Sequence, residues 1–267
     1  GGGGESAGMV AAAEQIELDL PRTFPSQPEL RTPSGKDRLR RVLLAHSRRN
    51  PQLGYTQSLN FLAALLLLQL PDTVGLLPGV RLEREVAAFW LLCAITEQLL
   101  PEHFTSLMLG VQVDTRVLDQ LVAEHPELHA AAAAIEASGF ELSLVSTQWF
   151  CMSFVNALPS ETTLRLWDLM LLHGAAALFA AALATLRALA AALAEVTDFE
   201  QCYTLLKQPH LHTLESDVFV RRMVVELEQL PPPRLAQLRA PQRVAVVAEM
   251  ARRDEARQAY HASAASA

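Results

Sequence analysis

Apolar residues recur at intervals of three and four along most of the chain, while the alternation typical of strands is nearly absent. An α-helix returns to one face every 3.6 residues, so this spacing indicates helices that each bury one side. The pattern predicts an all-α fold, with Pro71 to Val80 as a loop. Helices are expected over about residues 11–18, 36–48, 59–70, 83–100, 113–124, 127–138, 144–158, 160–173, 175–196, 198–206, 215–229 and 242–259.

The segment from Leu53 to Leu70 is the most apolar part of this pattern, and the rest of the fold is expected to surround it. Its helix is apolar almost all round, which is typical of a helix inside a core. The first turn gathers polar side chains, namely Gln57, Ser58 and Asn60. Exposed backbone amides and the helix dipole favour a phosphate there. The alternative is a simple N-cap by Thr56 or Ser58.

Composition indicates a globular protein and argues against a general nucleic-acid binder, with a local basic cluster left open. The 267 residues are 51% hydrophobic and 19% charged, enough for one large domain or two lobes. The net charge of -7 is unsuited to phosphate backbones. Cys93, Cys151 and Cys202 form no CxxC pair, and no signal peptide is visible, so a reduced, intracellular chain is expected. The apolar runs 59–70 and 175–194 fit buried helices better than membrane spans.

Several familiar chemistries are absent from the sequence. Ser34 to Asp37 lacks the upstream glycine and the hydroxyl residue of a phosphate loop, and there is no GxSxG or HExxH motif. His125 and His129 could share a helix face, but no third metal ligand is in view. The arginines from Arg38 to Arg49 indicate a solvated helix face, with an acidic partner or membrane headgroups as the alternative.

One pair of residues suggests a site. Arg22 lies in a loop between Pro21 and Pro25, three residues after Asp19. The prolines stiffen the loop and lower the entropy that Arg22 loses on docking, and Asp19 can hold the guanidinium in place. A guanidinium neutralises charge on a transferring phosphoryl group and a carboxamide such as that of Gln57 aligns the attacking water. The alternative is an ordinary surface arginine.

The motifs that carry these residues resemble a known family. Ile16, Asp19 and Arg22 form I-x-x-D-x-x-R, and Tyr55 and Gln57 form Y-x-Q. Both are similar to the paired arginine-finger and glutamine-finger motifs of the TBC domain, the Rab GTPase-activating domain. Further likeness follows in order at residues 39–45, 50–55, 88–92, 149–150, 158–159 and 164–174, so that it covers roughly residues 9–210.

The resemblance implies a V-shaped, two-lobed helical domain whose concave face receives a Rab-family small GTPase in its GTP-bound state. Arg22 and Gln57 would be the catalytic residues, supplied in trans, with Asp19, Tyr55 and Asp168 supporting them. An arginine finger is worth on the order of 10³ to 10⁵ in rate. The protein would be a GTPase activator with no nucleotide site, cofactor or metal of its own, because the partner carries GTP and magnesium.

Two departures from the family pattern bear on activity. The family usually follows its glutamine with Gly-Met-Asn, whereas this chain has Ser58, Leu59 and Asn60. The family's N-terminal Arg and Trp motif is missing. The expected organisation is therefore a flexible leader over 1–8, a TBC domain over 9–210 and a C-terminal helical extension with a loose tail over 211–267.

The expected setting is cytoplasmic vesicle trafficking, with at most peripheral association with intracellular membranes. Two alternatives stay open. One is a catalytically weak or inactive module of the same fold that binds a Rab as a scaffold. The other is a helical scaffold with no GTPase contact. The sequence specifies neither which Rab is recognised nor the oligomeric state.

Overall fold

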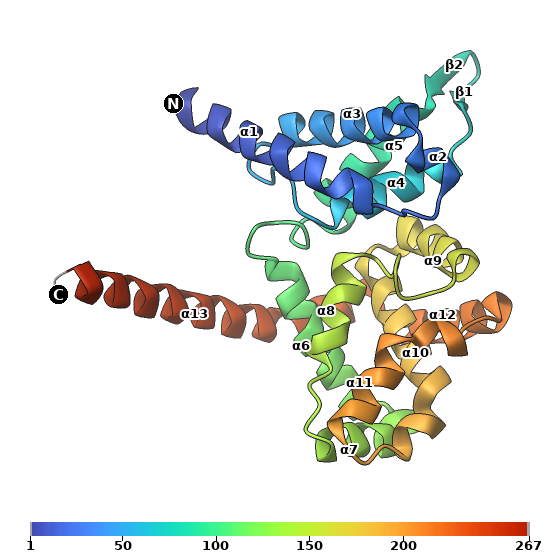
Figure 1. Cartoon of the computed structure of the whole chain (residues 1–267). Helices are drawn as coiled ribbons and strands as arrows, with labels where there is room; N and C mark the ends of the chain where they lie inside the picture. The colour runs from blue at the N-terminus through green and yellow to red at the C-terminus, as the bar shows by residue number, and fades with distance from the viewer. Residues whose placement is uncertain (1, 266–267) are drawn as a thin grey trace. The chain divides into compact units, whose positions relative to one another are not determined.

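The structure is a computed structural model that describes the backbone of residues 2–265, and it is almost entirely helical, as predicted (Figure 1). The α-helices are α1 Gly2–Asp19, α2 Pro28–Arg31, α3 Pro33–Arg49, α4 Leu59–Gln69, α5 Arg84–Ala94, α6 Leu109–Glu124, α7 His129–Ala137, α8 Ser143–Cys151, α9 Ser160–His173, α10 Ala175–Ala194, α11 Phe199–Lys207, α12 Ser216–Gln229 and α13 Pro232–Ala265. Short 3-10 helices are η1 Leu20–Arg22, η3 Pro126–Leu128 and η4 Pro209–His212, and η2 Ile95–Leu99 is a π-helix that continues α5.

The chain forms two compact units, and neither is a single stretch of sequence. The first unit comprises the chain up to Met108 together with Gln148–Ala175. The second comprises Leu109–Thr147 and the chain from Ala176 onward. Each unit therefore depends on segments that are distant in sequence.

Helix α4 is the centre of the first unit. Residues 59, 60 and 62–67 are buried, and α4 packs against α3 and α5. The predicted stripe of α3 is confirmed, because its members are all buried: Leu39, Val42, Leu43 and His46. The helix begins after a cap in which Gly35 N donates to Thr32 Oγ1 at 3.0 Å. The core-forming pattern of these two helices was thus readable from sequence.

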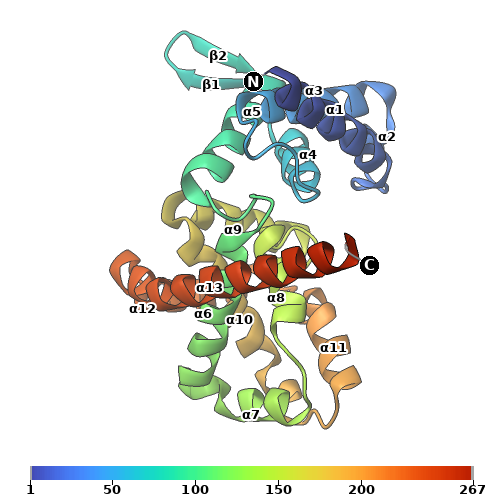
Figure 2. The same ribbon diagram turned by 90° about the vertical axis from the view of Figure 1, so that its left-hand side faces the viewer.

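A β-hairpin replaces the predicted loop from Pro71 to Val80, and this prediction was wrong. Strands β1 Thr73–Leu77 and β2 Val80–Glu83 pair antiparallel. Gly79 makes the turn with φ of +82°, a conformation that glycine adopts without steric cost. The strands are too short for a clear alternation of apolar and polar residues. Figures 1 and 2 both show the hairpin extending away from the helices of its unit.

Helices α1, α8 and α13 show the largest differences from the predicted boundaries. Helix α1 begins at Gly2, inside the segment expected to be a flexible leader. Helix α8 ends at Cys151 instead of near residue 158, because Ser153 and Phe154 have φ of +45° and +63°, which a right-handed helix excludes. Helix α13 begins at Pro232 instead of near residue 242 and continues through Pro241. Pro241 has no backbone N–H to donate, but residues on both sides of it, Leu235 and Val246, are buried.

Helix α10 is the core helix of the second unit. Its length and composition would suffice to cross a membrane, but 72% of its most apolar window is buried within the structure. Its small alanine side chains allow close approach of neighbouring helices. As the sequence predicted, α10 fits a buried core helix.

Ion pairs attach α13 to α6 within the second unit. Arg239 Nε and Nη2 donate to the two carboxylate oxygens of Asp114 at 2.7 and 2.5 Å, and Arg116 Nη2 donates to Glu249 at 2.7 Å. Beyond this contact residues 251–261 are exposed throughout. Figures 1 and 2 show this end of α13 extending past the helices of its unit.

Candidate functional site

Arg22 is displayed by a short, anchored loop that follows α1. We call residues 19–24 the arginine loop. Pro21 occupies the first turn of η1, and the neighbouring Leu20 and Thr23 are buried. Phe24 has φ of +43° and turns the chain. The side chain of Arg22 is 49% exposed, so the loop presents this cation at the surface while its neighbours fix the backbone.

The carboxylate of Asp19 is the centre of the site. It is fully buried and accepts hydrogen bonds from Arg22 Nη2, from Gln15 Nε2 at 3.2 Å and from Tyr55 Oη at 2.5 Å. The predicted contact between Asp19 and Arg22 is therefore present. Burial, with the hydrogen bond to Asp19, raises the pKa of Tyr55 above its usual value, so the phenol stays protonated and donates.

Gln57 lies at the surface in the segment that precedes α4. We call residues 50–58 the glutamine loop. Asn50 shapes it by accepting from Leu53 N through Oδ1 at 3.2 Å and from Gly54 N through its backbone carbonyl at 2.9 Å. Gly54 has φ of +63°, and Gln57 is exposed.

The N-cap alternative for this loop is wrong. Ser58 occupies the cap position of α4, but its side chain makes no cap hydrogen bond. The buried hydroxyl of Thr56 has no hydrogen-bond partner among the described residues. The polar residues of this turn therefore do not act as conventional caps.

Three contacts join the arginine loop to the glutamine loop and the start of α4. The first is the hydrogen bond from Tyr55 to Asp19. In the second, Asn60 Nδ2 donates to Thr23 Oγ1 at 2.7 Å, and that hydroxyl donates to Asp19 O at 2.7 Å. In the third, the Phe24 and Phe61 rings meet edge to face with centroids 5.3 Å apart. The two loops are thus parts of one assembly within the first unit.

Sequence reasoning missed the role of Asn60. It placed this residue in a polar helix tip beside Gln57 and Ser58, whereas Asn60 is fully buried and ties the two loops together. Its position in an otherwise apolar helix was a signal, because a buried carboxamide requires hydrogen-bond partners.

A cavity of about 590 Å³ lies between α1 and the glutamine loop. Its lining includes Ala12, Gln15, Leu53 and Tyr55. Neither Arg22 nor Gln57 lines it, and both are exposed. An exposed pair of polar side chains outside a concave pocket suits a macromolecular partner better than a small molecule.

Asp168, predicted to support the site, is exposed on α9. Its neighbour Trp167 is buried and donates from Nε1 to Ser153 O at 3.0 Å. The contacts around Asp19 among the described residues do not include Asp168, so its supporting role stays a prediction.

The other sequence candidates have local structural roles. His125 Nδ1 accepts from Glu127 N at 3.2 Å, and its Nε2 lies 3.5 Å from Glu226 Oε1. Among the side chains that the structure describes, no group of three or more His, Cys, Asp or Glu could hold a metal ion.

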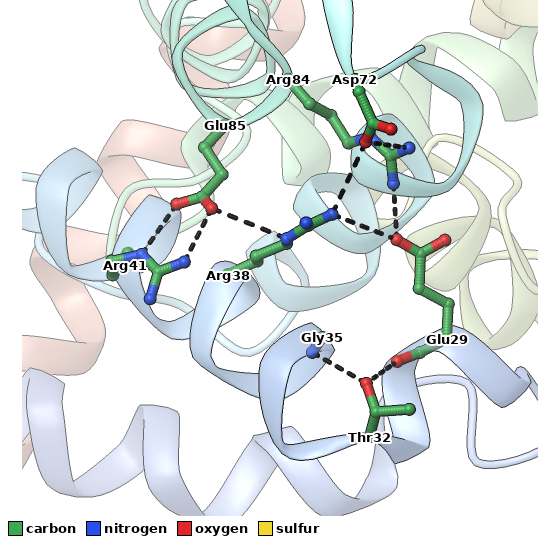
Figure 3. Close-up of polar contacts among 8 residues, drawn as sticks. All are labelled: Glu29, Thr32, Gly35, Arg38, Arg41, Asp72, Arg84 and Glu85. Carbon is green, nitrogen blue, oxygen red and sulfur yellow. Dashed lines mark hydrogen bonds and ion pairs between the residues drawn. The ribbon is translucent and has the colours of Figure 1, made fainter.

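The basic face of α3 is paired with acidic residues of its own unit. Arg41 donates to both carboxylate oxygens of Glu85 at 2.8 and 2.7 Å (Figure 3), and Arg49 pairs with Glu97. Hydrogen bonding to Arg41 lowers the pKa of Glu85 below its usual value. This pairing favours the interpretation of a solvated helix face over an unpaired basic patch.

The fold and the site together define a class: an all-helical domain that presents an arginine and a glutamine on two coupled surface loops. The chain belongs to the Rab-GTPase-TBC domain family, whose RabGAP-TBC profile matches residues 5–194. The match begins inside the expected leader and ends before residue 210.

Curated relatives extend well beyond this chain. TBC1 domain family member 2A of Mus musculus is 37% identical over 242 residues, which are 90% of this chain and 25% of that protein. Growth hormone-regulated TBC protein 1 of Xenopus laevis is 31% identical over 239 residues, 88% of this chain and 66% of that protein. The chain thus spans about a quarter of the length of the first relative.

Solved structures share the fold. The TBC domain of a Chlamydomonas flagellar RabGAP matches with a TM-score of 0.64 and 30% identity, covering 82% of this chain and 70% of that one. The Ypt/Rab-GAP domain of Gyp1p matches with a TM-score of 0.70 and 21% identity, covering 84% and 75%. At that identity the second match shows the fold alone.

Proposed function

We propose that this chain is a GTPase-activating domain for a Rab-family GTPase in its GTP-bound state, and that Arg22 and Gln57 enter the partner's nucleotide site. The observation that carries the proposal is the buried Asp19 carboxylate, which joins the arginine loop to Tyr55 of the glutamine loop. Family membership and the RabGAP name of the Chlamydomonas structure support it.

In this mechanism the protein supplies position and charge. The guanidinium of Arg22 neutralises charge that develops on the phosphoryl oxygens, and the carboxamide of Gln57 orients the attacking water. Asp19 binds Arg22 through one terminal nitrogen, Nη2. The remaining N–H donors of the guanidinium can then contact phosphoryl oxygens. GTP and magnesium arrive with the partner, and the chain itself contributes no cofactor.

Single-turnover GTP hydrolysis by a panel of Rabs tests the proposal. We expect Arg22→Ala to lower the stimulated rate by on the order of 10³ to 10⁵. We expect Arg22→Lys to remain badly impaired, because lysine lacks the planar fork of the guanidinium. We expect Gln57→Ala to lose most of the stimulation.

Arg48→Ala and Gln208→Ala, which alter exposed residues of the same types, serve as matched controls. Unchanged stimulation in the Arg22 and Gln57 variants would overturn the mechanism.

A second candidate function is Rab binding without acceleration of hydrolysis. Ser58 favours it, because this half-buried residue stands directly after Gln57, where the resembled motif has glycine. Tight binding of a Rab loaded with a transition-state mimic of GTP, without turnover, would support this alternative. If the Ser58→Gly variant then accelerates GTP hydrolysis, the low activity of the wild type would be assigned to the Ser58 side chain.

A further inference from the structure

The register of the β1–β2 hairpin places four of its apolar residues on one face. The Cα partners are Thr73 with Glu83, Val74 with Leu82, Gly75 with Arg81, and Leu77 with Val80. Opposed residues share a face and successive residues alternate, so the register shift between Gly75 and Leu77 returns Leu77 to the face of Val74. One face therefore carries Val74, Leu77, Val80 and Leu82, and the other carries Thr73, Gly75, Arg81 and Glu83.

The apolar face is covered at its base and open at its tip. Val74 and Leu82 are half-buried where the hairpin meets α5. Leu77 is 66% exposed and Val80 is 42% exposed. No polar side chain occurs from Gly75 to Val80, whereas exposed two-residue hairpin turns usually carry asparagine or aspartate.

Ion pairs clamp the base of the hairpin to helices α2 and α3. Arg84 follows β2 directly, and its guanidinium contacts Asp72 at 2.8 Å and Glu29 at 2.5 Å (Figure 3). Arg38 of α3 lies 3.6 Å from Glu29 and 3.9 Å from Asp72. The side chain of Arg84 is only 16% exposed. The clamp fixes the point at which the hairpin leaves its unit, and it neutralises the acidic groups there.

The remaining cation of the hairpin lies on its polar face. Arg81 is exposed, is opposed by Gly75, which has no side chain, and forms no ion pair with a described residue. A hairpin with an apolar face and an arginine on the other side matches a phospholipid interface, where apolar groups enter the acyl boundary and arginine reaches the phosphates.

We propose that the β1–β2 hairpin is a membrane-contacting element that places Leu77 and Val80 in a phospholipid interface and Arg81 at the headgroups. The inference concerns an interaction of this chain with lipid and does not depend on GTPase activation. A second copy of the chain is the competing occupant. The bulge disfavours a second copy that pairs along the strand edge. A second copy that packs on the apolar face is tested by sedimentation below.

The affinity should be modest. A single myristoyl chain, which buries more apolar surface than two side chains, binds bilayers with about 10⁴ M⁻¹. The hairpin would therefore assist membrane recruitment without anchoring the protein by itself.

Flotation of the full chain with phosphatidylcholine vesicles at millimolar lipid tests the proposal. We expect the wild type to bind and the double variant Leu77→Asp/Val80→Asp to bind at least about tenfold less, because two exposed apolar contacts are lost and two charges must be desolvated. The matched control is Leu172→Asp/Val244→Asp, which alters side chains that are 77% and 71% exposed elsewhere. Equal flotation of the hairpin variant and the wild type, or no flotation of the wild type, would overturn the proposal.

A site-specific probe separates insertion from other contacts. An environment-sensitive dye is attached to one new cysteine, either Leu77→Cys on the apolar face or Thr73→Cys on the polar face. Both variants also carry Cys151→Ser, and the remaining cysteines, Cys93 and Cys202, are buried. We expect vesicles to shift the emission of the dye at position 77 to the blue and to leave position 73 unchanged. Equal responses would contradict one-sided insertion.

Sedimentation velocity without lipid examines the competing occupant. A concentration-dependent dimer that disappears in Leu77→Asp/Val80→Asp, together with no vesicle binding, would assign the apolar face to a second copy and overturn the lipid proposal. A monomer that floats with vesicles supports it.

Discussion

Asp19 shows how one buried residue can determine the geometry of a surface site. Its carboxylate is inaccessible to solvent, yet its donors include Arg22 at the surface and Tyr55 in a different loop. In the proposed mechanism Asp19 and Tyr55 are positioning residues that act through Arg22 and do not touch the phosphate.

We predict that Tyr55→Phe weakens both the fold and the stimulated rate. The variant keeps the ring but removes a donor to a buried carboxylate, which costs about 1 to 3 kcal/mol of unfolding free energy. In the Rab assay we expect kcat to fall more than KM rises, because Arg22 is held less firmly. Chemical denaturation and Rab turnover measure the two effects.

Tyr260→Phe is the matched control, because that side chain is 71% exposed. A Tyr55→Phe variant with wild-type stability and wild-type kcat would show that the hydrogen bond to Asp19 has no positioning role.

His46 provides a pH-dependent contribution to stability. It is 1% exposed, and its Nε2 lies 2.9 Å from Thr96 Oγ1. Burial lowers the pKa of His46 to about 4, although nearby Glu97 opposes the shift. The unfolded chain takes up a proton below its ordinary pKa of 6.5, whereas the folded chain resists protonation until about 4.

We therefore predict that unfolding free energy falls as pH drops from about 6.5 to about 4, with a His46 contribution of about 3 kcal/mol. The contribution is fully present above pH 6.5 and is lost as the pH falls from there through the folded-state pKa. Denaturation curves across this range for the wild type and His46→Gln give the difference directly. His173→Gln, an exposed histidine, should leave the pH dependence unchanged. Parallel pH profiles for the wild type and His46→Gln would contradict the assignment.

Close packing of α2 against α3 determines the identity of residue 35. A Cβ at Gly35 would lie 2.0 Å from the carbonyl oxygen of Glu29, a backbone atom that cannot simply rotate away. By contrast, Gly8 in α1 has open space around the position of a Cβ. The same residue type is thus required in one helix and replaceable in another.

We predict that Gly35→Ala destabilises the protein by about 1 to 3 kcal/mol, because overpacking outweighs the gain in helix propensity. Gly8→Ala should instead stabilise it by up to about 1 kcal/mol. Midpoints of chemical denaturation measure both changes. A stabilised Gly35→Ala variant would mean that α2 moves away without cost, contrary to the packing described.

The hairpin and helix α8 illustrate where element prediction from sequence fails. The strands of the hairpin are defined by pairing with each other, and its bulge decides which residues share a face. Helix α8 ends because Ser153 and Phe154 adopt left-handed conformations. Trp149 and Phe154 stack across this turn with centroids 5.5 Å apart, and Trp167 binds Ser153 O, so tertiary contacts accompany the early end of α8.

At the scale of the whole molecule, each unit needs segments from separate parts of the chain. Helix α13 shows this dependence in the second unit, because its Arg239 pairs with Asp114 of α6, whose side chain is fully buried. Removing one partner would leave a buried charge with less compensation.

We predict that Arg239→Ala lowers unfolding free energy by about 3 to 5 kcal/mol, whereas deletion of the residues after Met250 changes it by less than about 0.5 kcal/mol. Of the removed residues, 251–261 are exposed and therefore contribute little buried surface. Chemical denaturation of the two variants and the wild type makes the comparison. A large loss of stability on truncation would show that the exposed end of α13 is packed in solution.

The sequence by itself determined the helical class, the buried α4, the inward stripe of α3 and the end of α9 at Gly174, whose φ is +59°. These features follow from periodicity and local backbone preference, which neighbouring residues encode. It also indicated the contact between Asp19 and Arg22, because the two are one helical turn apart. The catalytic roles of Arg22 and Gln57 stay predictions for the turnover assay.

Only the tertiary structure decided that Asn60 and Tyr55 join the two loops, and that a bulge makes one face of the hairpin apolar. The physical reason is sequence separation: the hydrogen bond from Tyr55 spans 36 positions of the chain and the one from Asn60 spans 37. The apolar face of the hairpin likewise depends on the register between its two strands. Local propensity carries no information on which distant donor will meet a buried acceptor.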